Sequence, residues 1–185
     1  TLTFGRVKNL WSVKKNKGPL LVFLGHVDVV PTGPESEWEH DPFSGFDDGT
    51  FINGRGTGDM KGGIACFMSA LSKIDVDNLN YSIGFLITAD EEGPSKDGTV
   101  KVVEELLHRN EKIDYCLIGE PSTLETVGDN IRIGRRGSIN IELEVLGKQG
   151  HAAYPARVDN PIHKVVPFLD KLLREVWDEG NEHFP

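Results

Sequence analysis

A short apolar run that ends in polar residues constrains the fold of this chain more than any other feature. Residues 20–24 are all apolar, and Gly25 then introduces a turn. An apolar run of this length bounded by a turn predicts a strand buried on both faces, as in a parallel sheet. His26 and Asp28 then lie at the carboxyl end of that strand, the edge at which open α/β sheets bind ligands.

Carboxylates stand at comparable places further along the chain. Asp59 precedes a helical pattern, Glu91 and Glu92 end one apolar run, and Glu120 ends another. Together with the His26 imidazole, they offer the nitrogen and oxygen ligands of a hydrolytic metal centre. Because a carboxylate has two oxygens, one acid can bridge two ions roughly 3.5–4 Å apart. Within the adjacent glutamate pair, one member can bind metal while its neighbour holds the water.

Each of these motifs taken alone has an ordinary structural interpretation. An isolated His-x-Asp is usually a surface or core pair, although Asp28, on the same strand face as His26, can accept the second imidazole N–H and fix its tautomer. A Glu-Glu pair is usually a solvated turn. Gly54, Gly56 and Gly58 suggest a phosphate loop, but they lack the Walker spacing and precede an acid. The order of the acids at successive strand ends favours a metal site.

Strands and helices alternate along the first 120 residues. This order predicts an α/β fold with a mixed, largely parallel sheet flanked by helices on both faces. A long connection over residues 31–58 is rich in Gly, Pro and Asp, and loops of this length in compact domains are usually functional. The predicted strands cover residues 11–13, 20–27, 81–89 and 114–119; the predicted helices cover residues 60–74 and 99–107; a hairpin or meander is predicted over residues 124–134.

The pattern changes after Gly137. Apolar and polar residues alternate over 139–145, which predicts a strand with one wet face. Asn160-Pro161 then marks the start of an amphipathic helix. One strand and one helix cannot bury both of their apolar faces alone, so we expect residues 137–185 to be the start of a truncated α+β domain. Residues 1–136 are predicted to form a partial metal-binding catalytic domain.

Charge and cysteine usage exclude some classes of protein. The net charge of −9 argues against nonspecific nucleic-acid binding, which depends on basic patches. No apolar run approaches membrane-spanning length, and the N-terminus has no signal-peptide pattern, so no membrane association is expected. Cys66 and Cys116 are far apart and lie in apolar segments. They are predicted to be buried, reduced packing residues of a cytoplasmic protein, although either can in principle be a ligand.

Four motifs, in order, resemble the M20 family of zinc amidohydrolases and exopeptidases. Longer matches are similar to the branch of that family that hydrolyses N-succinyl amino acids. The resemblance extends from about residue 9 to residue 167 and implies a zinc-peptidase-like catalytic domain followed by a dimerisation domain. The four motifs are His26-x-Asp28-x-Val30-Pro31, Gly56-x-Gly58-Asp59-Met60-Lys61-Gly62, Asp90-Glu91-Glu92 and Gly119-Glu120-Pro121. The longer matches are Pro31-Thr32-Gly33-Pro34, Thr88 to Pro94, Gly134 to Ser138, and Gly147 to Pro155.

The resemblance implies a set of metal ligands. His26, Asp59 and Glu120 would hold one zinc ion. Asp59 would bridge to a second zinc, which Glu92 also binds. Two zinc ions are thus expected in the complete enzyme, and cobalt is expected to be able to replace them.

It also implies the catalytic residues. Glu91 would be the general base that takes a proton from the attacking water and passes it to the leaving amine. Asp28 would orient His26, and His151 would stabilise the oxyanion in the other subunit of a homodimer. Arg135 is a candidate for binding a substrate carboxylate.

The reaction implied is hydrolysis of N-succinyl-L,L-2,6-diaminopimelate to succinate and L,L-diaminopimelate, in the cytoplasm of a bacterium that makes lysine and cell wall. Two alternatives stay open. One is a deacylase or dipeptidase of the same family that acts on another N-acyl amino acid. The other is a catalytically inactive binding module of the same fold, which the retention of Glu91 argues against.

One departure from the family pattern affects the second zinc. In the family, that ion takes a histidine from near the C-terminus of a longer chain, and no motif here matches it. A structural or surface role is expected for the four remaining histidines, which are His40, His108, His163 and His183. The sequence is therefore read as a fragment with one complete metal site, and the fragment itself is predicted to be inactive.

Overall fold

The computed structural model describes residues 1–134, 137 and 139–182. The chain divides into two compact units, Thr1–Ile131 and Arg132–Pro185. The predicted domain boundary after residue 136 stays a prediction, because residues 135, 136 and 138 lie outside the described residues.

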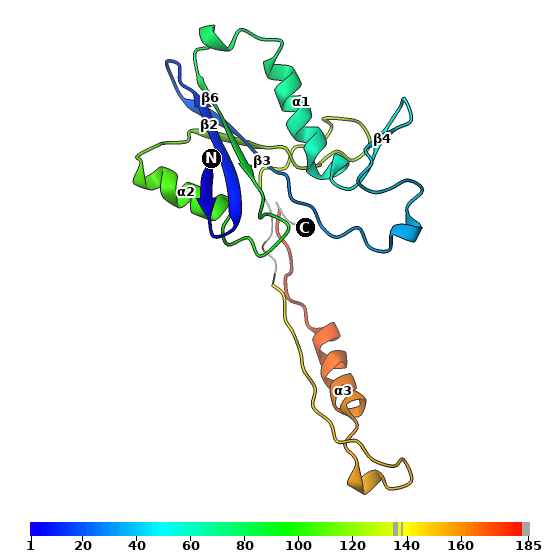
Figure 1. Cartoon of the computed structure of the whole chain (residues 1–185). Helices are drawn as coiled ribbons and strands as arrows, with labels where there is room; N and C mark the ends of the chain where they lie inside the picture. Colours follow the sequence, from blue (N-terminus) through cyan, green and yellow to red (C-terminus); the bar gives the residue numbers. More distant parts are fainter. Residues whose placement is uncertain (135–136, 138, 183–185) are drawn as a thin grey trace. The chain divides into compact units, whose positions relative to one another are not determined.

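Within the described residues, five strands of the first unit form a mixed sheet in the order β1-β2-β6-β3-β7 (Figure 1). β3 pairs in parallel with both β6 and β7, whereas β2 pairs antiparallel with β6 and with β1. The predicted mixed sheet is confirmed, and the apolar run identified from the sequence has a neighbouring strand on each side. The strands are β1 (Leu2–Phe4), β2 (Val7–Lys14), β3 (Leu20–His26), β6 (Ser82–Thr88) and β7 (Tyr115–Ile118).

Successive residues of β3 face different helices because side chains alternate along a strand. One face packs on α2 (Thr99–His108), and the other packs on α1 (Gly62–Leu71) (Figure 1). On the α1 face, the Phe23 ring stacks on that of Phe67 with centroids 4.3 Å apart. The cluster on the α2 face contains Leu20, Val22, Leu86, Val102 and Leu106, all buried. Both predicted helices are confirmed, α1 being shorter than its pattern.

The long connection after β3 contains short elements of its own. β4 (Phe46–Asp47) and β5 (Ile52–Asn53) form a small antiparallel hairpin, and a 3-10 turn covers Glu35–Glu37. The predicted hairpin over residues 124–134 is wrong. That segment contains no strand, and the Asp129 carboxylate instead accepts hydrogen bonds from the main-chain N–H groups of Leu124, Glu125 and Thr126.

Both cysteines are exposed, which corrects the prediction that they are buried. Cys66 precedes Phe67 on α1 and lies away from the helix face that packs on the sheet. Cys116 lies in β7, which pairs only with β3 among the described residues and leaves all four of its own residues exposed. An apolar segment at an edge does not bury its cysteine unless a further layer covers it.

The second unit contains one long helix, α3 (Pro161–Arg174), within its described residues. Its predicted start is confirmed: Pro161 occupies the first turn, and the Asn160 side chain accepts a hydrogen bond from the Ile162 N–H at 3.0 Å. The predicted strand over residues 139–145 is wrong, since none of them is in a strand. A one-faced strand needs a pairing partner, and the only ladder contact described in this unit is the single bridge between Lys148 and Asp159.

Among the described residues, none of the helices combines the length and the apolar character that a membrane crossing requires.

Candidate metal centre

Parallel pairing brings the ends of three strands to one edge of the sheet. His26 of β3 is in register with Thr88 of β6, and Leu24 of β3 is in register with Ile118 of β7. The segments that follow β6 and β7 therefore leave the sheet beside His26. Each of these segments carries acids that the sequence placed at strand ends.

Asp59 reaches the same edge from the turn that precedes α1. This turn covers Thr57–Lys61, and Met60 within it is only 1% exposed. The Met60 sulfur accepts a hydrogen bond from the main-chain N–H of His26 at 3.3 Å. The buried thioether thus fixes the turn against the end of β3, a contact that sequence reasoning missed.

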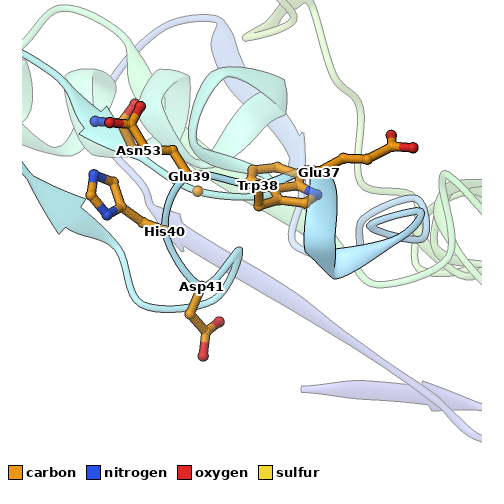
Figure 2. A pocket seen from close by; sticks show the side chains of 7 residues that line it. Glu37, Trp38, Glu39, His40, Asp41 and Asn53 are labelled. Atoms are coloured by element: carbon orange, nitrogen blue, oxygen red, sulfur yellow. The ribbon is translucent and has the colours of Figure 1, made fainter.

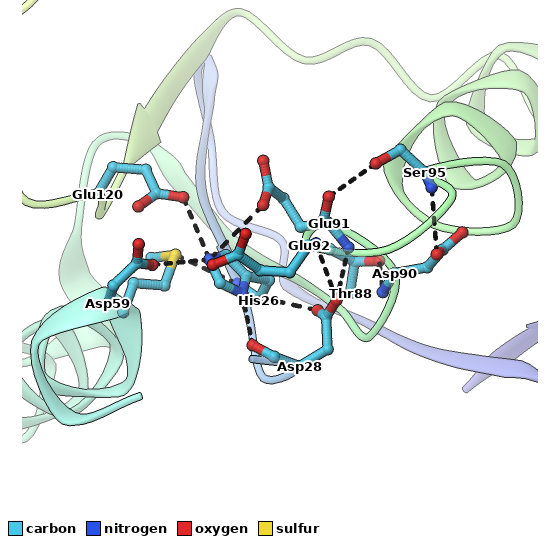
Figure 3. A network of polar contacts seen from close by, with 10 residues as sticks. His26, Asp28, Asp59, Thr88, Asp90, Glu91, Glu92, Ser95 and Glu120 are labelled. Atoms are coloured by element: carbon cyan, nitrogen blue, oxygen red, sulfur yellow. Dashed lines mark hydrogen bonds and ion pairs between the residues drawn. The ribbon is translucent and has the colours of Figure 1, made fainter. Parts of the chain in front are cut away.

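The Nε2 atom of His26 faces three carboxylates (Figure 3). It lies 3.1 Å from Asp59 Oδ1, 3.3 Å from Glu120 Oε1 and 4.0 Å from Glu91 Oε2. The donor atoms of His26, Asp59 and Glu120 all lie within 4.8 Å of one another, and so do those of His26, Glu91 and Glu92. These are the two groups of three or more potential ligands found among the described residues.

The orientation of the His26 ring is set by Asp28. With a proton on Nδ1, the ring donates a hydrogen bond to the main-chain oxygen of Asp28 at 2.9 Å, and Nε2 is left with its lone pair toward the acids. The Asp28 carboxylate lies slightly further from the ring, with Oδ1 3.6 Å from Nδ1. Its other oxygen accepts hydrogen bonds from the main-chain N–H groups of Glu91 and Glu92, both at 2.9 Å (Figure 3).

Burial and neighbouring negative charges raise the pKa values of Glu92 and Glu120 at this edge. Burial is the largest cause of the raised pKa of Glu92, followed by the negative charges of Asp59 and Glu91. The pKa of Glu120 is raised first by burial and then by Asp59. Although burial alone would lower the pKa of His26, the Asp28 carbonyl and the surrounding carboxylates outweigh it and raise that pKa.

These donors fit a divalent metal ion. The crowded carboxylates repel one another, and a cation between them would favour their ionised forms. An imidazole nitrogen with two carboxylate oxygens is a ligand set that zinc accepts, and three protein ligands leave room for a further one.

Asp90, which precedes the glutamate pair, was not assigned a role from the sequence. It is 7% exposed, and the pKa of its carboxyl is lowered because it accepts main-chain hydrogen bonds from Asp97, Lys96 and Ser95, which outweigh the effect of burial. A signal was present in the sequence, since an Asp followed by a Gly- and Pro-rich segment is typical of residues that hold a loop through its own backbone.

Two further site residues predicted from the sequence, His151 and Arg135, do not belong to either group of potential ligands found among the described residues. His151 belongs to the second unit, where it is exposed, accepts a hydrogen bond from the Ala153 N–H at 3.0 Å and lies near the Tyr154 ring. Arg135 lies outside the described residues. Their proposed roles therefore stay predictions.

The remaining histidines do not join either group of potential ligands among the described residues. The His40 ring packs against the Phe46 ring at a tilt of 31° with centroids 3.7 Å apart, and it lines a surface cavity together with Trp38 and Asn53 (Figure 2). His108 ends α2 and His163 lies in α3. His183 lies outside the described residues.

Residues 22–185 match the sequence model described as peptidase family M20/M25/M40. The chain belongs to this family. Membership of the family is consistent with the acids gathered around His26. The resemblance in the sequence rested on short motifs, whereas this match extends over residues 22–185.

Curated relatives within the M20 family are similar over the whole of this chain. Proteins named succinyl-diaminopimelate desuccinylase from Marinobacter nauticus, Hydrogenovibrio crunogenus and Nitrosomonas europaea are 54%, 53% and 50% identical to it, respectively. In each case the match covers 100% of this chain and 50% of the relative. The chain thus spans about half the length of the curated relatives it matches.

Solved structures of M20 relatives share the fold. The M20 family metallo-carboxypeptidase Sso-CP2 from Sulfolobus solfataricus aligns with a TM-score of 0.51 over 62% of this chain and 26% of its own. Human carnosine dipeptidase 1 aligns with a TM-score of 0.52 over 62% of this chain and 25% of its own. Both are 24% identical to this chain, so the likeness concerns the fold alone.

Proposed function

We propose that this chain is the part of a zinc-dependent amide hydrolase that carries its metal ligands and general base, and that the enzyme releases succinate from N-succinyl-L,L-2,6-diaminopimelate. The observation that carries the proposal is the position of His26 Nε2 within 3.3 Å of both Asp59 and Glu120, with Glu91 beside them. The substrate is inferred from the names of relatives that are half identical to this chain.

In this proposal, His26, Asp59 and Glu120 hold one zinc ion, and Asp59 with Glu92 contributes to a second. A bound zinc ion supplies Lewis-acid polarisation of the scissile carbonyl and lowers the pKa of water. Cobalt is a candidate replacement. The number and identity of the ions can be measured by elemental analysis of the full-length protein.

Glu91 is the proposed general base. Its carboxylate takes a proton from water as the water oxygen bonds to the succinyl carbonyl carbon. When the carbon–nitrogen bond breaks, the same proton passes to the amine of diaminopimelate, and succinate is the other product. The hydrogen bond from the Nδ1–H of His26 to the Asp28 carbonyl orients the ring and turns Nε2 toward the acids.

The proposal also covers His151, which belongs to the second unit, and Arg135, which lies outside the described residues. His151 would stabilise the oxyanion in the other subunit of a cytoplasmic homodimer, and Arg135 would bind a substrate carboxylate. A preorganised donor of this kind contributes a factor of about 100 to 1000 to the rate. His151→Ala is therefore expected to lower kcat of the full-length enzyme by that factor.

The deciding experiment measures succinate release by the full-length protein with a panel of N-succinyl, N-acetyl and dipeptide substrates. N-succinyl-L,L-2,6-diaminopimelate should have the highest kcat/KM, and chelation should abolish turnover. Glu91→Gln should retain metal and lose nearly all turnover, because the amide keeps the shape but accepts no proton. Preference for a dipeptide, or full activity of the Glu91→Gln variant, would refute the proposal.

A further inference from the structure

Glu91 stands at the start of a loop, residues 90–97, that we call the Asp90 loop. Half of the Glu91 side chain is exposed, so packing restrains it weakly. The main chain of the loop therefore decides where the carboxylate stands relative to His26. On the side of β3, the Asp28 carboxylate holds the main-chain N–H groups of Glu91 and Glu92.

A second carboxylate holds the same loop from within. Asp90 Oδ1 accepts a hydrogen bond from the Ser95 N–H at 3.2 Å, and Oδ2 accepts those of Lys96 and Asp97, both at 2.8 Å. The Ser95 hydroxyl donates in turn to the main-chain oxygen of Glu91 at 2.7 Å (Figure 3). Asp90 thus reaches the main chain of Glu91 through one intermediate residue.

The far end of the Asp90 loop is tied into the interior. The Asn9 side chain on β2 is fully buried and donates a hydrogen bond to the Asp97 carbonyl at 3.0 Å. At the near end, the N–H of Asp90 donates to the Thr88 hydroxyl at 3.3 Å.

The strength of the contacts inside the loop comes from the charge of Asp90. Hydrogen bonds to an ionised carboxylate are stronger than neutral ones, so Asp90 holds the loop more firmly than backbone contacts alone would.

We propose that Asp90 is a positioning residue: by closing the Asp90 loop it fixes the main chain of Glu91 and keeps the Glu91 carboxylate beside His26. The inference rests on the proposed function, in which Glu91 is the base. General-base catalysis depends on distance and alignment, and a displacement of about 1 Å can lower a rate about 100-fold.

The first test is Asp90→Asn in the full-length protein. The amide keeps the size of the side chain but turns an NH2 group toward main-chain donors, so at least one hydrogen bond is lost. We expect kcat at saturating zinc to fall by about 10- to 100-fold while KM changes by less than about 2-fold. Asp48→Asn is the matched control, because Asp48 also accepts two main-chain N–H groups in a tight turn, that of the β4–β5 hairpin.

A double variant separates positioning from general stability. If Asp90 acts through Glu91, then Asp90→Asn should change the residual rate of Glu91→Gln by less than about 2-fold, since a base that is absent cannot be misplaced. A merely structural role would lower both backgrounds by the same factor. If the losses in rate caused by Asp90→Asn and Glu91→Gln multiply in the double variant, the proposal is wrong.

A readout that does not depend on activity is hydrogen–deuterium exchange of the peptide covering residues 91–97. Exchange should rise in Asp90→Asn and stay unchanged in Glu91→Gln and in Asp48→Asn, both with zinc and after chelation. Should Asp90→Asn fail to fold, Ser95→Ala decides, because it removes only the hydroxyl that holds the Glu91 carbonyl. Its kcat should fall by about 3-fold or more, which corresponds to the net free energy of one hydrogen bond.

The outcomes separate this inference from the function on which it rests. Full turnover by Glu91→Gln would contradict the assignment of the base. If Glu91→Gln is inactive while Asp90→Asn and Ser95→Ala both keep kcat within about 2-fold of the unmodified enzyme, the base stands and the positioning role is wrong.

Discussion

The two units of this chain carry similar apolar patterns but bury them very differently. In the first unit, Phe23 and Val102 are 2% and 0% exposed. In the second, Ile141 and Leu173 are 77% and 85% exposed, although each belongs to an apolar pattern of comparable regularity. Periodicity tells which side chains can share a face, whereas burial requires a second surface to cover that face.

The strands show the same contrast. β3 has a strand paired on each side and a helix packed on each face, so both faces of its apolar run are covered. Residues 139–145 alternate as a strand should, yet no strand forms there. The contrast implies that the stability of the chain resides mainly in the first unit.

Phe23→Ala should have the largest effect. Removing a buried aromatic side chain costs about 3–5 kcal/mol in unfolding free energy through lost transfer energy and the cavity that remains. Ile141→Ala is the matched change in the second unit and should cost less than about 0.5 kcal/mol. Urea unfolding monitored by circular dichroism measures both. Equal costs would show that Ile141 is as buried as Phe23.

Zinc should stabilise the first unit by the next largest amount. A ligand that binds only the folded state at about 100 times its Kd adds about 2.7 kcal/mol to the unfolding free energy. Thermal unfolding with zinc and after chelation measures this, and hydrogen exchange of residues 161–174 should not respond. Asp59→Asn, which removes a ligand charge, should weaken the effect. A zinc response unaltered by that variant would place the ion elsewhere.

Asn160→Ala should destabilise α3 by a smaller amount. The Asn160 side chain caps the helix by accepting the Ile162 N–H, and loss of such a cap costs about 1 kcal/mol. Hydrogen exchange should rise in the first turn of α3, while Asn160→Ser, which can still cap, should behave as the unmodified chain. Exchange that spreads into β3 or β6 would mean that the two units unfold together.

The smallest effect concerns pH. The Lys112 ammonium, and then the Leu20 main-chain N–H, lower the pKa of Asp114. A carboxyl whose folded pKa lies below its unfolded value stabilises the fold above the unfolded pKa, and that contribution is lost as the pH falls through the folded pKa. Between about pH 6 and about pH 3, the urea midpoint should therefore fall less in Asp114→Asn than in the unmodified chain. A urea midpoint that falls equally in both proteins would contradict this role of Asp114.

Much of the fold could be predicted from local pattern. The continuous apolar run at residues 20–24 identified β3, and the 3.6-residue spacing identified α1, α2 and α3. β1 was missed because three residues at an edge carry too little periodicity. Cys66 and Cys116 were predicted to be buried because their neighbours in the sequence are apolar. Apolar neighbours do not show which face of a helix or strand is covered by another element.

At the candidate site, the acids that the sequence singled out at strand ends do gather around His26. The contacts that hold them in place were not predictable. The Asp28 carboxylate holds a loop more than sixty positions further along the chain, and Met60 holds the main chain of His26. Neither contact has a signature in residue spacing.

The sequence by itself determined the kinds of chemical group available: an imidazole directly after Gly25, a carboxylate before a helical pattern, and carboxylates at the ends of two later apolar runs. Only the tertiary structure decided which oxygen meets which nitrogen. The physical reason is that parallel register joins His26 to Thr88 and Leu24 to Ile118. Hydrogen bonds form only between atoms that lie within a few ångströms of one another, so they depend on that register. The periodicity of a sequence does not predict the register between two strands.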